Sequence, residues 1–152
     1  MKTIETDEDI KSAKARALAQ ELHENTDDID ETKLDADTYT CGAHDYLVLT
    51  DAEADKRAAE AIKESAWAFN ADFILGECGL DLSGAESLKS MQEKSCEDAN
   101  DFIVSLIEKT CGMEQFVDSA VSADGRGHFL SGYDSNEREQ VIDNIIYYIY
   151  KQ

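Results

Sequence analysis

The sequence has no proline, no long hydrophobic run and few basic residues. The absence of proline favours long helices and argues against proline-rich linkers. The sequence contains no apolar stretch of the roughly eighteen residues that a transmembrane helix needs, so we expect no membrane partner. The start MKTIETDEDIK also lacks the apolar segment of a secretory signal peptide, which predicts a cytoplasmic protein.

The shortage of basic residues is the most extreme feature of the composition. The chain has 14 Lys and Arg against 34 Asp and Glu, for a formal net charge of −20, and acids exceed bases in every third of it. Binding to phosphates requires clustered Lys and Arg, so direct contact with nucleic acid is disfavoured. A basic protein surface is the partner that this charge favours.

Cysteine and histidine patterns give little support for a metal site. Cys41, Cys78, Cys96 and Cys111 are widely spaced, with no CxxC, and we expect free, mostly buried thiols. Cys41 and His44 have the C-x₂-H spacing of half a zinc site, but no close pair supplies a second half. No local signature supports a cysteine nucleophile. We therefore expect no metal and no cofactor.

The length of 152 residues suits a single domain over residues 1–152. The pattern predicts an N-terminal helix over 7–24, an acidic loop over 25–37 and an α+β core over 38–152. Strands are predicted at 38–49, with a hairpin turn near Gly42 to Asp45, and at 145–150. The expected fold class is therefore α+β, mostly helical with a small antiparallel β-sheet.

Two capping boxes mark predicted helix starts. Thr50-Asp-Ala-Glu53 opens a helix that is expected to reach about Ile74, and Ser83-Gly-Ala-Glu86 opens another. The second apolar pattern continues past Ser95, either in one long helix or in two. Further helices are predicted over 113–121 and 136–144.

The stretch over residues 24–37 holds seven acids and one base. It lacks the glycine and the ligand spacing of an EF-hand calcium loop. Two interpretations remain, a solvated acidic loop or a contact surface for a basic partner. The candidate partner-binding residues are Glu24, Asp27, Asp28, Asp30, Glu31, Asp35 and Asp37.

The stretch SADGRGHFLSGYDSNE, residues 122–137, gathers residue types that can carry chemistry. Its spacing matches neither HExxH nor GxGxxG, and Asp124-Gly125 is a turn dipeptide. This favours a structural turn in which Arg126 pairs with a nearby carboxylate. The alternative is a ligand or catalytic site that uses Asp124, Arg126, His128 and Asp134, with Glu137 as a further carboxylate.

The C-terminal strand is rich in tyrosine, at Tyr147, Tyr148 and Tyr150. The favoured interpretation is a sheet with one packed face. The alternative is an edge strand that supports a homodimer or docks a partner.

Three blocks carry a resemblance to a known family. YLVLTDAEAD (46–55), SADGRGHFLSGYDSNE (122–137) and YYIYK (147–151) resemble a family of small acidic proteins encoded by phages and prophages. The resemblance covers residues 46–152 and implies no catalytic residue. It implies a glycine where this chain has Ser135, and a less helical segment before the terminal strand. Small acidic phage proteins often resemble anti-CRISPR or anti-restriction inhibitors, some of which mimic DNA.

The resulting hypothesis is a non-enzymatic, phage-encoded anti-defence protein that acts in the cytoplasm of the bacterial host. It is expected to be an anti-CRISPR inhibitor that binds a basic nucleic-acid-binding surface of a Cas effector or other nuclease, as a DNA mimic. The alternatives are a small-ligand-binding or enzymatic phage protein that uses the DGRGH loop, and a phage accessory interaction protein.

Overall fold

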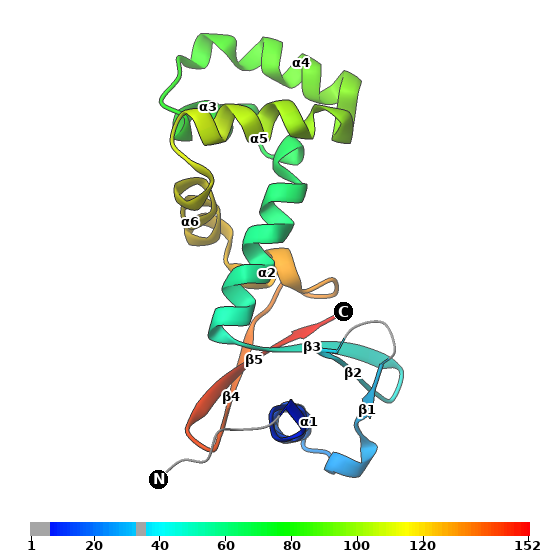
Figure 1. The fold of residues 1–152 in the computed structure, drawn as a ribbon. Coiled ribbons are helices and arrows are strands. Elements are labelled where there is room, and N and C mark those ends of the chain that lie inside the picture. Colours follow the sequence, from blue (N-terminus) through cyan, green and yellow to red (C-terminus); the bar gives the residue numbers. More distant parts are fainter. Residues whose placement is uncertain (1–6, 33–35) are drawn as a thin grey trace. The chain divides into compact units, whose positions relative to one another are not determined.

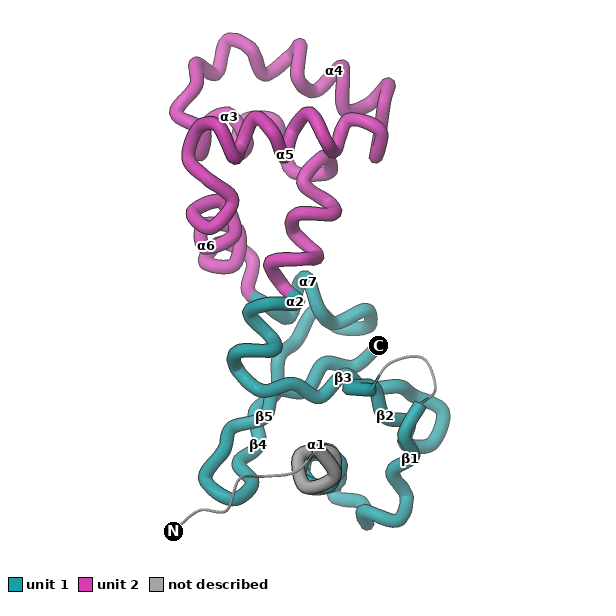
Figure 2. Tube along the Cα trace, in the orientation of Figure 1, with its two compact units in different colours: residues 1–57, 126–152 teal, residues 58–125 magenta. Residues whose placement is uncertain are grey.

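The computed structural model describes residues 7–32 and 36–152, and they fall into two compact units (Figure 2). Unit 1 combines residues 1–57 with 126–152, and unit 2 comprises residues 58–125. Helices predominate, beside one five-stranded antiparallel sheet, which confirms the α+β class. The single domain over 1–152 stays a prediction.

Unit 1 holds the sheet (Figure 1). Its elements are α1 (Asp7–Leu22), η1 (Thr26–Asp28), β1 (Asp30–Glu31), β2 (Thr38–Cys41), β3 (His44–Thr50), the first half of α2 (Asp51–Glu64), α7 (Arg126–Leu130), β4 (Arg138–Ile142) and β5 (Ile145–Lys151). The strand order is β1-β2-β3-β5-β4. The predicted N-terminal helix and the hairpin turn at Gly42 are confirmed, since β2 and β3 pair up to the turn, with Cys41 opposite His44.

The core of unit 1 lies between α1 and one face of the sheet. Strand residues alternate between the two faces, so Tyr39, Val48, Tyr147 and Ile149 share the face that packs on α1. The helix contributes the small side chains of Ala13 and Ala17 and the larger ones of Leu18 and the partly buried Leu22. The small alanines allow the helix to approach the tyrosine rings closely, which explains why an alanine-rich stripe forms a core.

The segment before the last strand differs from the prediction. Residues 136–144 were expected to be helical, but Arg138–Ile142 form β4, which pairs with β5 in a hairpin. The two turn residues, Asp143 and Asn144, both have positive φ angles of 51° and 67°. Asp and Asn tolerate the left-handed conformation that a two-residue hairpin turn requires. Pairing with β5 thus outweighs the helix propensity of Glu, Arg and Gln.

The tyrosine-rich strand is not an edge. Strand β5 lies between β3 and β4 and bonds to both, so it has no free backbone edge for a partner. The interpretation of residues 145–150 as an edge strand is therefore wrong, while a homodimer stays a prediction. Tyr147 and Tyr150 are almost fully buried, in agreement with packed sheet faces.

Unit 2 is helical and contains the second half of α2. Its other elements are η2 (Ala66–Ala68), α3 (Ala71–Glu77), η3 (Leu82–Gly84), α4 (Ala85–Ser95), η4 (Cys96–Ala99), α5 (Asn100–Lys109) and α6 (Met113–Asp124). The core includes Ile62, Ile74, Ile103 and Phe116, which have no exposed surface. The predicted short helix over 113–121 is confirmed and extends to Asp124.

The helix predicted over residues 51–74 ends early. The Thr50–Glu53 capping box is confirmed, because the Glu53 backbone N–H donates to Thr50 Oγ1 and the Thr50 backbone N–H donates to Glu53 Oε1. However, α2 ends at Glu64, and Asn70 caps the separate helix α3 by accepting from the Asp72 backbone N–H at 2.9 Å. The single helix to Ile74 is therefore wrong.

The region after α3 also differs in detail. Ser83 does not form a capping box, because the Asp81 side chain accepts from the Ser83 backbone N–H and Gly84 precedes α4 without a side-chain cap. Two helices follow instead of one long helix, since Cys96 takes a left-handed φ of 48° after Ser95. Of the two alternatives for this segment, the break near Ser95 is confirmed.

All four cysteines are free, but only Cys78 is buried, so the prediction of mostly buried thiols is wrong. Cys96 is exposed on unit 2. Within residues 7–32 and 36–152, no helix has the length and apolar character to cross a bilayer.

Of the eight glycines, Gly127 leaves the least room for a Cβ atom. A Cβ atom at this position would lie 2.4 Å from the Ser135 carbonyl oxygen and 2.9 Å from the Glu137 backbone nitrogen. Ser135 itself has φ 58°, in the left-handed region that favours glycine. The second glycine of DGRGH therefore lets α7 touch the segment that leads into β4.

We predict that Gly127→Ala destabilises unit 1 by about 2 kcal/mol, because the methyl group must displace main-chain atoms. The matched control is Gly132→Ala, where a Cβ would meet only Gln152 at an ordinary 3.5 Å. Urea unfolding followed by circular dichroism measures both. Equal stabilities of the two variants would contradict the close contact at Gly127.

Candidate functional site

Arg126 lies at the centre of a cluster of polar side chains in unit 1. Its Nε donates to Glu137 Oε1 at 2.8 Å, and its Nη1 donates to Asp51 Oδ1 and Asp55 Oδ1, both at 2.9 Å. The guanidinium carbon also lies 4.4 Å from the centre of the Tyr148 ring. Only 11% of the Arg126 side chain is exposed. The cluster therefore ties α7 to the start of α2, to β5 and to the loop before β4.

The protonation states in this cluster are fixed by its geometry. Burial acts to lower the pKa of Arg126, but the hydrogen bonds to Glu137 and Asp51 outweigh it and raise that pKa above its usual value. Burial, followed by the hydrogen bond to Glu137, raises the pKa of Tyr150. Arg126 thus stays charged and Tyr150 stays neutral. Neither group is poised to exchange a proton near neutral pH.

The candidate residues of the DGRGH loop that lie in unit 1, Arg126, His128 and Asp134, have separate contacts. Asp124 ends α6 and belongs to unit 2, while the other three belong to unit 1. Asp134 bonds to Arg138 at 2.9 Å and to Ser131 at 3.1 Å, and His128 is exposed, with its ring against Phe129. The predicted pairing of Arg126 with a nearby carboxylate is confirmed. Arg126 and Asp134 form structural ion pairs, and among the described contacts of these side chains there is no nucleophile–base pair.

A second cluster holds Lys14, which is only 2% exposed. Its Nζ lies 2.7 Å from Asp37 Oδ1 and 2.9 Å from Glu53 Oε1, and Arg57 Nη2 lies 2.9 Å from Asp37 Oδ2. Burial, followed by the charge of nearby carboxylates, raises the pKa of Tyr39 to about 12. Asp37, predicted as a partner-binding residue, therefore has internal basic partners.

The other predicted acidic residues lie mostly on the surface. Asp35 lies outside the described residues, and Asp30 and Glu31 form the short strand β1 instead of a loop. Five carboxylates are exposed and make no ion pair with a basic side chain in the part of the chain that the structure describes: Glu24, Asp27, Asp28, Asp30 and Glu31. We refer to these five as the acidic segment.

The acidic segment creates a local negative potential. Burial, followed by the charges of Glu24, Asp28 and Asp30, raises the pKa of the Cys41 thiol. A thiol resists ionisation when negative charge is close, so the three carboxylates act on the same region of unit 1. Such a surface repels phosphates and attracts Lys and Arg.

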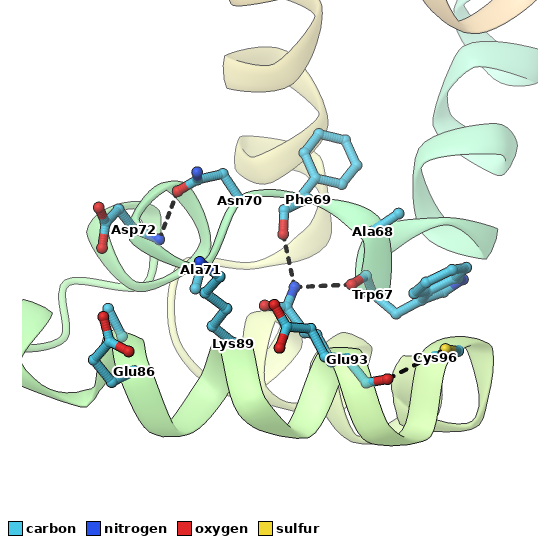
Figure 3. A pocket seen from close by; sticks show the side chains of 12 residues that line it. Trp67, Ala68, Phe69, Asn70, Ala71, Asp72, Glu86, Lys89, Glu93 and Cys96 are labelled. Carbon is cyan, nitrogen blue, oxygen red and sulfur yellow. Dashed lines mark hydrogen bonds between the residues drawn. The ribbon is translucent and has the colours of Figure 1, made fainter.

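Unit 2 contains a pocket with a volume of about 470 Å³ (Figure 3). One wall is the turn from Trp67 to Asp72, and the other is α4 with Glu86, Lys89 and Glu93. The turn is held in place by the Gln92 side chain of α4, whose Nε2 donates to the carbonyl oxygens of Trp67 and Phe69 at 2.8 and 2.7 Å. The pocket is open to solvent and mixes aromatic, acidic and basic side chains.

Sequence reasoning did not find this pocket. Trp67 is the only tryptophan of the chain, but the sequence alone does not show what its turn packs against. The position of that turn depends on Asn100, whose side chain accepts from the Trp67 backbone N–H and donates to the Lys63 carbonyl. Asp51 and Asp55, the partners of Arg126, were also missed, although their spacing of four residues places them on one helix face.

Among the described residues, no group of three or more His, Cys, Asp or Glu side chains is arranged to hold a metal ion. Comparison with family models, with curated proteins and with solved structures gives no match to this chain.

We predict that Arg126→Lys lowers the free energy of unfolding by about 2 kcal/mol, because an ammonium cannot bond to Glu137 and to the α2 carboxylates at once or stack on Tyr148. The matched control is Arg16→Lys, because Arg16 forms one exposed pair with Asp143. That change should cost less than about 0.5 kcal/mol. Urea unfolding measures both, and equal losses would contradict the central role of Arg126.

A pH titration tests the Asp134 contacts separately. The hydrogen bond from Arg138, followed by that from the Asn136 backbone, lowers the pKa of Asp134 to about 2. Because this pKa lies below the ordinary 3.8, the stabilisation is present above pH 4 and is lost as the pH falls toward 2. Arg138→Gln should move the pKa of Asp134 up toward 3.8. Carboxyl ¹³C NMR measures it, with Arg16→Gln as the control that leaves it unchanged.

Proposed function

We propose that this protein is a non-enzymatic inhibitor that occupies the basic nucleic-acid-binding surface of a protein partner. The observation that carries the proposal is the acidic segment, with five exposed carboxylates that have no basic partner among the described residues. A protein that binds through Lys and Arg to phosphates meets in this segment a surface of the same charge as nucleic acid.

The distribution of the basic residues supports the same proposal. Unit 1 has 20 acids and 10 bases, and unit 2 has 14 and 4, so each unit carries a formal charge of −10. Among the described residues of unit 1, five bases form ion pairs within the chain: Lys14, Arg16, Arg57, Arg126 and Arg138. Basic side chains that pair within the protein do not add positive charge elsewhere on the surface. The rest of the surface is therefore more uniformly negative than the composition alone implies.

Within this class, an anti-CRISPR is the specific form that we propose. A Cas effector holds its nucleic acids in positively charged channels that it recognises by backbone and shape, so a DNA mimic can compete there without base contacts. The protein would act in the cytoplasm of the bacterial host, and the likeness to small acidic phage proteins in three sequence blocks stays a hypothesis of the same kind.

The test is competition with DNA. We predict that the wild-type chain displaces labelled duplex DNA from a susceptible member of a panel of Cas effectors and other nucleases, and that the effect weakens on the order of tenfold between low and high salt. Neutralising the acidic segment, with Glu24→Gln, Asp27→Asn, Asp28→Asn, Asp30→Asn and Glu31→Gln combined, should weaken displacement at least as much.

The matched control removes five exposed acids from unit 2, namely Glu60, Glu64, Asp101, Glu114 and Asp118, by the same isosteric changes. It removes the same five negative charges from the chain, so a much smaller loss in the control assigns the effect to the acidic segment. Equal losses would overturn the role of the segment. Failure of the wild-type chain to displace DNA from every panel member would overturn the proposed inhibition.

A further inference from the structure

We propose that the pocket beside Trp67 in unit 2 is a recognition site for one arginine side chain of a protein partner. The inference rests on the proposed function, because it names the group through which a basic partner is held in addition to the acidic segment. It is carried by a cavity of about 470 Å³ whose lining combines an indole ring with carboxylates.

The charges around the pocket favour a cation. Three exposed carboxylates line it, Asp72, Glu86 and Glu93, against the single ammonium group of Lys89. Lys89 makes no ion pair within 4 Å among the described side chains, so it does not close the pocket with a salt bridge. The rim therefore has a net charge of −2, within a unit whose own net charge is −10.

The aromatic wall favours arginine over lysine. Figure 3 shows the Trp67 ring at one end of the pocket, Asp72 and Glu86 at the other end, and Glu93 between them on α4. A guanidinium is planar and weakly hydrated, so it can stack on an indole while its N–H groups bond to carboxylates. Its three-carbon stem also suits the apolar part of the wall.

The pocket is formed in advance of any ligand. The two hydrogen bonds from Gln92 fix the carbonyls of Trp67 and Phe69, and Asn100 fixes the Trp67 backbone by accepting from its N–H. The turn that carries the indole is thus held by two side chains that come from α4 and α5. A preorganised site loses less conformational entropy when a side chain enters it.

Trp67 also makes the site directly observable, because it is the only tryptophan of the chain. The full-length protein gives one indole N–H signal in a ¹H–¹⁵N NMR spectrum, and that signal belongs to the pocket. The probes are three capped tripeptides, Gly-Arg-Gly, Gly-Lys-Gly and Gly-citrulline-Gly. Citrulline has nearly the shape of arginine but carries no charge.

We predict that the arginine peptide shifts the Trp67 signal with a dissociation constant on the order of 1 mM, as expected for one side chain. The lysine peptide should bind severalfold more weakly, and the citrulline peptide should not shift the signal. Glu93→Gln should weaken arginine binding about threefold to fivefold. The matched control, Glu60→Gln, removes the same charge from the exposed side of α2 and should leave binding unchanged.

Three outcomes would overturn the proposed arginine site. They are a Trp67 signal that the arginine peptide does not shift, an equal shift with the citrulline peptide, and an equal loss of arginine binding in the Glu60→Gln and Glu93→Gln variants. The first outcome, with DNA competition intact, would overturn the arginine site alone. Absence of DNA competition with an intact arginine response would instead overturn the proposed inhibition alone.

Discussion

The ion pairs of Arg126 are the interaction on which unit 1 depends. One largely buried guanidinium bonds to the start of α2 and to Glu137, and it stacks on β5 through Tyr148. The next residue, Gly127, lies against the backbone of Ser135 to Glu137, so the same short helix fixes both the cation and the segment that carries its carboxylate. An acidic chain has few cations, and a forked side chain holds more carboxylates than any other single residue can.

This use of cations has a consequence for the surface. Lys14 and Arg126 are largely buried cations, and their carboxylate partners neutralise charges that would be most costly if they were unpaired. The carboxylates left outside face water and one another. Their mutual repulsion weakens the folded state, and contact with a basic partner relieves it. The internal pairing of bases and the proposed affinity for an external basic surface are thus two results that one charge imbalance would have.

Local signals predicted much of the fold, and long-range pairing accounts for what they missed. The Thr50–Glu53 capping box and the turn at Gly42 involve neighbours in sequence, and both are confirmed. Strand β4 was missed because Glu, Arg and Gln favour helices, whereas its hairpin depends on Asp143 and Asn144 and on pairing with β5. Arg126 meets Asp51 and Asp55 across 75 and 71 positions, and the Trp67 turn depends on Asn100, 33 positions later. No local pattern records such pairs.

The acidic segment and the Trp67 pocket would contribute to binding in different ways. Exposed carboxylates such as Asp27 and Asp28 act over a Debye length, so they raise the rate of encounter with a basic surface but distinguish poorly between partners. A cation held between an indole and Glu93 is partly removed from water, so salt screens it less and its geometry matters more. Attraction at long range and selection at short range are separate tasks. A uniformly negative protein that performed only the first would bind any basic surface it met, and a preformed pocket for one side chain is the kind of feature that restricts this choice.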